Sequence, residues 1–364
     1  MALRVCFVVG ARPNFMKAAP VYRALRELDP SVELRLLHTG QHYDASMSAV
    51  FLEELELPAA DELLGVGSGT HAEQTARALV AVERALATQP PDVVVVSGDV
   101  NSTLAAALAA VKLELRVAHI ESGLRSYDVS MPEEHNRRLT DHLSSVLFVH
   151  SASAANNLSR EGIAPGCVHL VGNTMIDSLF AHLERARAAR PWERFGLEPG
   201  AYGLVTLHRP ALVDDGELLA AATERLVRLA DDFPLVFPVH PRTLGRLDAL
   251  GLRRRLDASG VAVVGPLGYH DFVGLEAEAL FVLTDSGGVQ EETSALGVRC
   301  FTLRDVTERP VTVERGTNTI LGLHPDRIAD IPALLRQERT AEPVPLWDGA
   351  AGRRAAEVLL RELA

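Results

Sequence analysis

The chain has little cysteine, with three in 364 residues, and the three stand far apart. Cys6, Cys167 and Cys300 lack the close spacing that zinc ligands show, and each stands singly. Cys6 and Cys300 lie in strand-like runs, where a small, buried, apolar role is the usual one for cysteine. We therefore expect neither a disulfide nor a metal site.

Long apolar runs and an excess of positive charge are also missing. No apolar run approaches membrane-spanning length. The amino terminus enters a strand-like run at residues 3–10, which is too short, and too soon followed by turn residues, for a signal peptide. The formal net charge of -12 disfavours nonspecific binding to nucleic acid or to an anionic membrane surface. We expect a cytoplasmic protein whose partner is a small molecule.

The chain does have an alternating pattern of strands and helices. Its 364 residues, 47% of them hydrophobic, are enough for two domains. Strand-like runs alternate with amphipathic helical patterns, which indicates an α/β fold with parallel sheets covered on both faces. The runs fall into two sets: 3–10, 33–40, 92–99, 116–122, 145–151 and 168–172, then 202–208, 235–240, 261–266, 280–285, 299–303 and 318–322. A polar segment at 185–200 separates them and suggests a hinge.

Residues 284–292, TDSGGVQEE, form the most informative motif. They follow a buried strand-like run, and the glycines allow backbone N–H groups to approach a ligand where the next helix begins. Ser286, Gly287 and Gly288 are therefore expected to bind a diphosphate. Glu292, about one turn further on, is expected to accept hydrogen bonds from ribose hydroxyls. An ordinary glycine turn, with Glu292 as a helix-dipole partner, is the alternative.

Other polar motifs also follow predicted strands. Because the carboxyl ends of parallel strands meet at one edge of a sheet, we expect Asp99, Glu121 and Glu133 to converge there. Helix caps at Asp99 and Glu121, and a Glu133–Arg137 pair one turn apart, are the ordinary alternatives.

Cationic and imidazole side chains stand at further strand ends. Arg12 and Lys17 follow the first strand, where they can face phosphate, although a surface role for Arg12 stays open. His208 and His240 occupy strand tips in the second half. His119 is expected to be a satisfied or solvated histidine.

Taken together, the motifs resemble those of the non-hydrolysing UDP-N-acetylglucosamine 2-epimerases over nearly the whole chain. Ten of them occur in the order GARPNFMKAAP, HTGQHYD, GDVNSTLAAALAA, HIESGLRS, MPEEHNRRLTDH, VGNTMIDSL, TLHRP, PVHPRT, TDSGGVQEE and TERPVTVERGT. A single motif of this kind would be weak evidence, but ten in order are strong.

The resemblance implies two Rossmann-like, doubly wound domains facing across a cleft in the glycosyltransferase-B arrangement. Residues 1–172 would form the first and 173–348 the UDP-binding second, with a helix at about 349–364 packing back on the first. It implies a homodimer that interconverts UDP-N-acetylglucosamine and UDP-N-acetylmannosamine through UDP and 2-acetamidoglucal, with no cofactor. The lack of a GxGxxG fingerprint agrees with independence from NAD.

By the same resemblance, Asp99, Glu121 and Glu133 match the family's catalytic carboxylates, and His208 its functional histidine at the diphosphate. Arg309, in the motif TERP, is assigned to the phosphates or to loop closure. We expect Asp99 and Glu121 to be the acid and base at carbon 2, with Glu133 as a positioning carboxylate.

One part of the pattern departs from the family. Gln41 and His42 match a segment that, in some bacterial members, helps to hold a second, activating substrate molecule. Those members carry an arginine in the loop at residues 65–70, and an arginine and a glutamate where this chain has Pro210 and Ala211. We therefore expect a simpler site without activation by substrate.

Three other functions remain possible from the sequence. A hydrolysing epimerase would release N-acetylmannosamine and UDP, and a retaining glycosyltransferase would use the same architecture with an acceptor. A nucleotide-sugar sensor would bind without turnover. A pure sensor has no use for three clustered carboxylates, which favours the enzyme.

Overall fold

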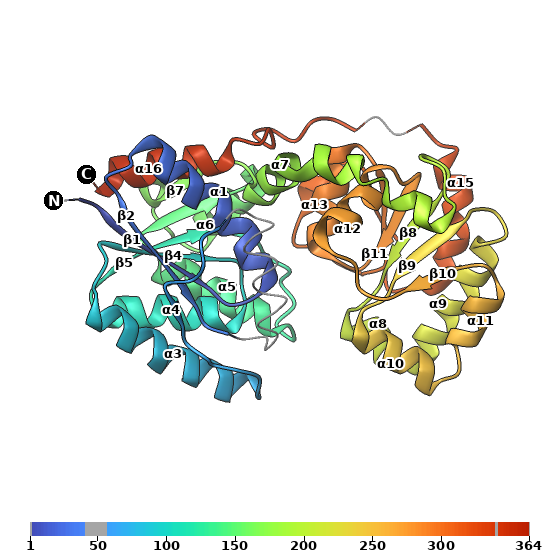
Figure 1. The fold of residues 1–364 in the computed structure, drawn as a ribbon, viewed down its shortest axis with the longest axis horizontal. Helices are drawn as coiled ribbons and strands as arrows, with labels where there is room; N and C mark the ends of the chain where they lie inside the picture. The colour runs from blue at the N-terminus through green and yellow to red at the C-terminus, as the bar shows by residue number, and fades with distance from the viewer. Residues whose placement is uncertain (1, 41–56, 339–340, 364) are drawn as a thin grey trace. The chain divides into compact units, whose positions relative to one another are not determined.

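The computed structural model describes residues 2–40, 57–338 and 341–363, and for Arg12 the backbone only. The chain divides into two compact units (Figure 1). Unit 1 comprises Met1–Ser178 and Pro345–Ala364, and unit 2 comprises Leu179–Val344. In the described ranges, no helix is both long and apolar enough to cross a membrane.

Unit 1 is built on a parallel sheet of seven strands in the order β3-β2-β1-β4-β5-β6-β7. The order runs outward in both directions from β1 and β4, so the sheet is doubly wound. The strands are β1 Arg4–Val9, β2 Glu33–His38, β3 Glu62–Leu63, β4 Val93–Ser97, β5 Arg116–Ile120, β6 Val146–Val149 and β7 Val168–Leu170.

Helices cover both faces of this sheet. Cys6, Val8, Val94 and Val96 pack with buried residues of α3 and α4 on one face, and α1 contacts β1 and β4. At the far end of the sequence, α16 returns to lie beside α1, red against blue in Figure 1. The helices of this unit are α1 Arg12–Leu28, α3 His71–Thr88, α4 Asn101–Lys112, α5 Pro132–Leu143, α6 Ala152–Arg160 and α16 Ala351–Leu363, with the 3-10 turn η1 Pro165–Cys167.

Unit 2 repeats the plan with a six-stranded parallel sheet in the order β10-β9-β8-β11-β12-β13. Its strands are β8 Gly203–Thr206, β9 Leu235–Pro238, β10 Ala262–Val264, β11 Phe281–Thr284, β12 Arg299–Thr302 and β13 Asn318–Ile320. Its helices are α8 Pro210–Val213, α9 Gly216–Leu229, α10 Pro241–Ala249, α11 Arg253–Ala258, α12 Tyr269–Ala277, α13 Gly287–Leu296, α14 Pro310–Glu314 and α15 Ile331–Leu335, with 3-10 turns η2 Pro191–Phe195 and η3 Pro325–Asp330.

Successive residues of the unit 2 strands pack into different cores. Val205 and Leu283 join a cluster with α9, whereas their neighbours Leu204 and Val282 join another with Trp192 and α12. Side chains alternate across a strand, so these strands are buried on both faces and appear in sequence as continuous apolar runs.

Each of the twelve predicted strand-like runs contains a strand, which confirms the doubly wound α/β class. The two-residue strand β3 is an addition. The segment 185–200, which the sequence suggests as a hinge, carries the end of α7 (Thr174–Ala188) and η2, with Pro191 and Trp192 buried. It belongs to unit 2, and the contact boundary lies within α7, between Ser178 and Leu179.

Candidate active site

In unit 1, the predicted site residues gather where β1, β4 and β5 end. The strand order reverses between β1 and β4, and open α/β sheets bind ligands at such a point, beyond the carboxyl ends of the strands. Asp99 follows β4 by two residues, and Glu121 follows β5 directly. The pairing of β4 with β5 brings these two carboxylates to neighbouring strand ends.

The turn between β1 and α1 is fixed by Asn14. Its side-chain oxygen accepts hydrogen bonds from the N–H groups of Gly10 and Ala11, at 3.1 and 3.0 Å. Its amide group donates to the carbonyl of Ser97 at the end of β4, at 2.7 Å. A Cβ at Gly10 would lie 2.0 Å from the Ser102 hydroxyl, so glycine is required for this approach of α4. The turn that carries Lys17 is thereby tied to the strand that leads to Asp99.

Glu121 forms a buried ion pair with Lys17, and both side chains are less than one-tenth exposed. Its backbone is left-handed, with φ at 70°, which an L-residue adopts at a cost of about 1–3 kcal/mol. A Cβ added at Gly98 would lie 3.0 Å from Lys17 Nζ and 3.4 Å from Glu121 Oε2. The pair therefore lies directly against the β4 turn, and Lys17 contacts a carboxylate where the sequence predicts a phosphate.

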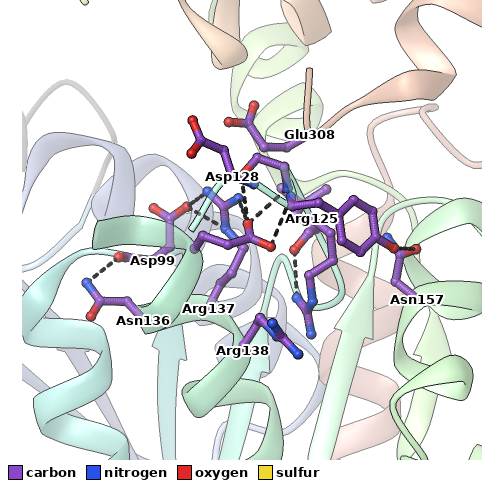
Figure 2. A network of polar contacts seen from close by, with 12 residues as sticks. Asp99, Arg125, Asp128, Asn136, Arg137, Arg138, Asn157 and Glu308 are labelled. Carbon is purple, nitrogen blue, oxygen red and sulfur yellow. Dashed lines mark hydrogen bonds and ion pairs between the residues drawn. The ribbon is translucent and has the colours of Figure 1, made fainter. Parts of the chain in front are cut away.

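Asp99 is paired with Arg137 of α5. The guanidinium reaches Asp99 Oδ2 through Nε at 3.1 Å and Nη2 at 2.5 Å, while Nη1 reaches Glu134 Oε2 at 2.7 Å. Figure 2 shows Arg137 against this carboxylate, with Asn136 donating to the Asp99 carbonyl at 2.9 Å. The Asp99 side chain is 23% exposed and Glu134 is buried, so Asp99 is the end of the network that a ligand can reach.

Glu133 lies one helical turn before Arg137, on the same face of α5, and is half-buried. The alternative that Glu133 pairs with Arg137 is wrong, because Arg137 contacts Asp99 and Glu134 instead. Helix capping by Asp99 is also wrong, since the residue before α4 is Val100. Glu121 is the first residue of a turn, not of a helix. Neither Asp99 nor Glu121 is therefore the residue that directly precedes a helix.

A buried series of polar contacts links His119, Asp141 and Arg125 next to the ends of β4 and β5. His119 Nδ1 lies 2.7 Å from Asp141 Oδ1 and Nε2 lies 2.8 Å from the Gly98 carbonyl, so both ring nitrogens face an oxygen acceptor. Asp141 Oδ2 lies 2.8 Å from Arg125 Nη1. Burial opposes ionisation of Asp141, but the hydrogen bond and charge of His119, together with Arg125, bring its pKa below the ordinary value. The expectation that His119 is satisfied is confirmed.

In unit 2, the strand order reverses between β8 and β11, and Asp285 links the two strand ends. Its Oδ2 accepts hydrogen bonds from the N–H groups of His208 and Arg209, at 2.8 and 2.7 Å. Its Oδ1 lies 3.1 Å from His208 Nδ1, within ion-pair range. Asp285 is fully buried, whereas the His208 side chain is 35% exposed. The Nδ1 side of the His208 ring therefore faces the buried carboxylate, and Nε2 lies on the other side of the ring.

Helix α13 begins at Gly287, after Ser286. A Cβ at Gly287 would lie 2.4 Å from Arg309 Nη1 and 2.8 Å from its Cζ, so the guanidinium packs on the helix start. Arg309 Nε lies 2.9 Å from Glu291 Oε1, and Nη1 lies 3.3 Å from Glu308 Oε2. A cation at the positive end of a helix is unfavourable by itself. An anion bound there is attracted both by the helix end and by the Arg309 guanidinium. The geometry is suited to binding an anionic group.

The remaining predicted residues of unit 2 surround the same strand ends. Ser286 and Gly288 are half-buried, and Glu292 is buried within α13. His240 precedes α10 and accepts a hydrogen bond from the Arg242 N–H at 3.2 Å. Its ring centroid lies 5.9 Å from that of His208. Unit 2 therefore places His240 beside His208.

The predictions left out three residues that organise these sites: Arg137 as the partner of Asp99, Asp285 and Asp141. The signal for Asp285 was present, because an acid directly after a buried strand and before a glycine turn stands at a strand end. Predictions for the Arg12 side chain, Gln41 and His42 lie outside the described residues. Within the described parts, no group of three or more His, Cys, Asp or Glu residues is arranged to hold a metal ion.

The chain is similar to known proteins over nearly its full length. The family model for UDP-N-acetylglucosamine 2-epimerase matches residues 24–360. The UDP-N-acetylglucosamine 2-epimerase of Methanocaldococcus jannaschii is 40% identical over 363 residues, covering 98% of this chain and 99% of its own. A Pseudomonas aeruginosa relative, named UDP-2,3-diacetamido-2,3-dideoxy-D-glucuronate 2-epimerase, is 38% identical over 364 residues, covering 99% and 100%.

A solved structure agrees with these relatives. The crystal structure of the Methanocaldococcus jannaschii UDP-GlcNAc 2-epimerase in complex with UDP-GlcNAc and UDP superposes with a TM-score of 0.90 and 41% identity. The match covers 99% of this chain and 100% of that one. From the family match and these identities, we conclude that the chain belongs to the UDP-N-acetylglucosamine 2-epimerase family of enzymes.

Proposed function

We propose that the protein interconverts UDP-N-acetylglucosamine and UDP-N-acetylmannosamine by elimination and re-addition of UDP, without hydrolysis. The observation that carries this proposal is the pair of carboxylates at adjacent strand ends, Asp99 after β4 and Glu121 after β5. Each is held by its own cation, Arg137 or Lys17. Two carboxylates fixed in this way suit a reaction that removes a proton from one side of a carbon and returns one to the other.

The chemistry requires that UDP leaves. Carbon 2 of the sugar has no adjacent carbonyl group, so its hydrogen is not acidic at neutral pH. When the bond between carbon 1 and the diphosphate oxygen breaks, its electron pair leaves with UDP and carbon 1 becomes oxocarbenium-like. A carboxylate then takes the carbon 2 proton, and the C–H electron pair forms the double bond of 2-acetamidoglucal.

Re-addition restores the nucleotide sugar with the opposite configuration. The second acid delivers a proton to the other face of carbon 2, and the UDP oxygen bonds again to carbon 1. No atom is gained or lost, so neither water nor an oxidant enters the balance. We assign Asp99 and Glu121 to these two proton transfers and Glu133 to positioning.

Unit 2 is assigned to UDP. Arg309, His208 and the N–H groups at the start of α13 would stabilise the negative charge of the departing diphosphate, and loss of one such donor typically costs about 2.7–4 kcal/mol of barrier. Glu292 would accept hydrogen bonds from the ribose. The M. jannaschii complex contains UDP-GlcNAc and UDP, which supports this class of ligand. Arg12 and Lys17 remain proposed phosphate ligands.

Proton NMR in deuterated water with UDP-N-acetylglucosamine tests the proposal in one tube. We expect deuterium at carbon 2 of both epimers and accumulation of UDP-N-acetylmannosamine. Free N-acetylmannosamine with UDP would instead show the hydrolysing reaction. A silent spectrum with UDP still bound would indicate a sensor or a different sugar, such as the diacetamido glucuronate named for the P. aeruginosa relative.

A further inference from the structure

Glu276 is a fully buried acidic residue that the proposed mechanism does not use. It lies near the end of α12 and has no exposed surface. Neither carboxyl oxygen has a hydrogen-bond partner among the residues that the structure describes. An ionised carboxylate in such a place has lost its water without gaining a donor, which is strongly unfavourable. The group is therefore expected to be neutral.

The negative charge that acts on Glu276 comes from Glu292. The helices α12 and α13 are in contact, and Glu292 on α13 is itself only 5% exposed. Burial, and then the charge of Glu292, hold the pKa of Glu276 well above its usual range. Two buried carboxyl groups that repel each other do not readily ionise together, so the charge of Glu292 favours the protonated form of Glu276.

The other titratable groups around α12 are engaged elsewhere. Before β8, Tyr202 donates its hydroxyl to the Leu275 carbonyl at 2.6 Å. After α12, Glu278 pairs with Arg187 at 2.8 Å.

On α12 itself, Asp271 pairs with Arg194 of η2 at 2.6 Å, and His270 contacts His182 of α7 at 3.3 Å. Glu193 of η2 pairs with Arg190, the residue before η2, at 2.7 Å. None of these groups acts on Glu276 as Glu292 does.

We propose that Glu276 is a positioning residue for Glu292: it holds the proton of the buried pair, so that Glu292 meets the ribose hydroxyls as an anion. The inference rests on the assignment of Glu292 to ribose in the proposed function. A neutral Glu276 places no charge against Glu292, whereas an ionised Glu276 repels an anionic Glu292. Ribose recognition should therefore weaken as the pH rises and Glu276 loses its proton.

The test compares calorimetric affinities for UDP and 2′,3′-dideoxy-UDP, from neutral pH upward, in the wild type, E276Q and E276M. In the wild type, the preference for UDP should fall roughly tenfold as Glu276 ionises, the scale of one hydrogen bond to a charged group. E276Q keeps a neutral polar group and should hold the preference at all pH values. E276M, which is also uncharged, should hold the preference in the same way.

A second measurement does not depend on UDP. The infrared spectrum of the wild type at neutral pH should contain the carbonyl band of a buried, protonated carboxyl group, and E276Q should lack it. Absence of that band, or an equal UDP preference in all three proteins at every pH, would overturn the inference. If UDP fails to bind the wild type although the band is present, the proposed function is wrong, whereas the protonation of Glu276 is still supported.

Discussion

At the scale of single residues, the proposed roles of Asp99 and Glu121 can be tested by substitutions that remove the negative charge of the side chain but keep its size. Asp99→Asn and Glu121→Gln retain shape and hydrogen-bonding oxygens, so Arg137 and Lys17 keep acceptors nearby. We expect each variant to lose about 10²–10⁴-fold in turnover, the usual contribution of a positioned acid or base. UDP affinity should hardly change, because neither carboxylate is among the proposed ligands of UDP.

NMR turnover and calorimetric UDP binding, measured on the same preparations, decide this point. A loss of UDP affinity that matches the loss of rate would show that Asp99 and Glu121 act in binding. Circular dichroism confirms that each variant is folded.

Arg137 pairs with the accessible carboxylate of Asp99 and with the buried carboxylate of Glu134. Replacing Arg137 should therefore lower both the stability of the protein and its rate of turnover. Arg137→Met leaves Glu134 buried without its cation, and removing one partner of a buried ion pair typically costs about 3–5 kcal/mol. Arg138→Met is the matched control on the same helix. That side chain is 49% exposed and lies 3.4 Å from Glu161, and such surface pairs contribute about 0–1 kcal/mol. Denaturant unfolding of both variants checks the difference, and equal effects would refute it.

At the scale of elements, the start of α13 allows a test with one methyl group. Gly287→Ala places a Cβ 2.4 Å from Arg309 Nη1, so the flexible guanidinium must move. We expect UDP affinity to fall about tenfold or more, the scale of one hydrogen bond to a charged group. Gly245→Ala in α10 is the control, because its added Cβ meets nothing within 4 Å.

Calorimetry with UDP measures both glycine variants. Gly245→Ala should bind UDP normally and gain about 0.5–1 kcal/mol of stability, since alanine is a better helix former than glycine. Unchanged UDP binding by Gly287→Ala would argue against a diphosphate at this helix start.

Helix α16 begins on a buried acid, which gives unit 1 a pH-dependent contact. Asp177 accepts hydrogen bonds from the N–H groups of Ala351 and Gly352, at 3.1 and 2.6 Å. Burial raises the pKa of Asp177 from 3.8 to about 6, against those hydrogen bonds. The folded protein therefore binds this proton more tightly than the unfolded chain does. The resulting stability is present below pH 3.8 and is lost as the pH rises through about 6.

The wild type should thus lose up to about 3 kcal/mol relative to Asp177→Asn across that window. Unfolding free energies of the two proteins, subtracted at each pH, isolate this group from other acids. Asp348→Asn supplies the opposite case, because the hydrogen bond from Arg354 lowers the pKa of Asp348 and its stabilisation is lost as the pH falls. A flat difference for Asp177→Asn would contradict the prediction.

The elements themselves were largely predictable from sequence, and the contacts between them were not. Strands buried on both faces leave continuous β-branched runs, which is why Val93–Ser97 was visible, whereas the two residues of β3 carry no periodicity. Motif order placed Asp99 and Glu121 at strand ends. The cations that pair with them could not be predicted from the sequence. Lys17 and Glu121, for example, are 104 positions apart and come together only because the sheet forms.

At the scale of the whole molecule, the chain leaves unit 1 within α7 and returns at Pro345, so the last residues complete the first unit. The Trp347 Nε1–H donates to the His150 carbonyl at 3.0 Å, and the buried face of α16 packs against α1. A Cβ at Gly352 would lie 2.6 Å from the Pro20 backbone, so the two helices approach as closely as glycine allows. Deleting residues 345–364 therefore uncovers an apolar face of unit 1 and removes nothing from unit 2.

Hydrogen exchange of the shortened protein, resolved by peptide, should show this asymmetry. We expect faster exchange in α1 and β1, with β8 and β11 as protected as in the full chain, because their core is built from residues of unit 2 alone. Gly352→Val is a milder companion, since it separates α16 from α1 without shortening the chain. Equal loss of protection in both sheets would show that the two units unfold as one, and the return of the carboxyl terminus would then stabilise the whole enzyme rather than unit 1.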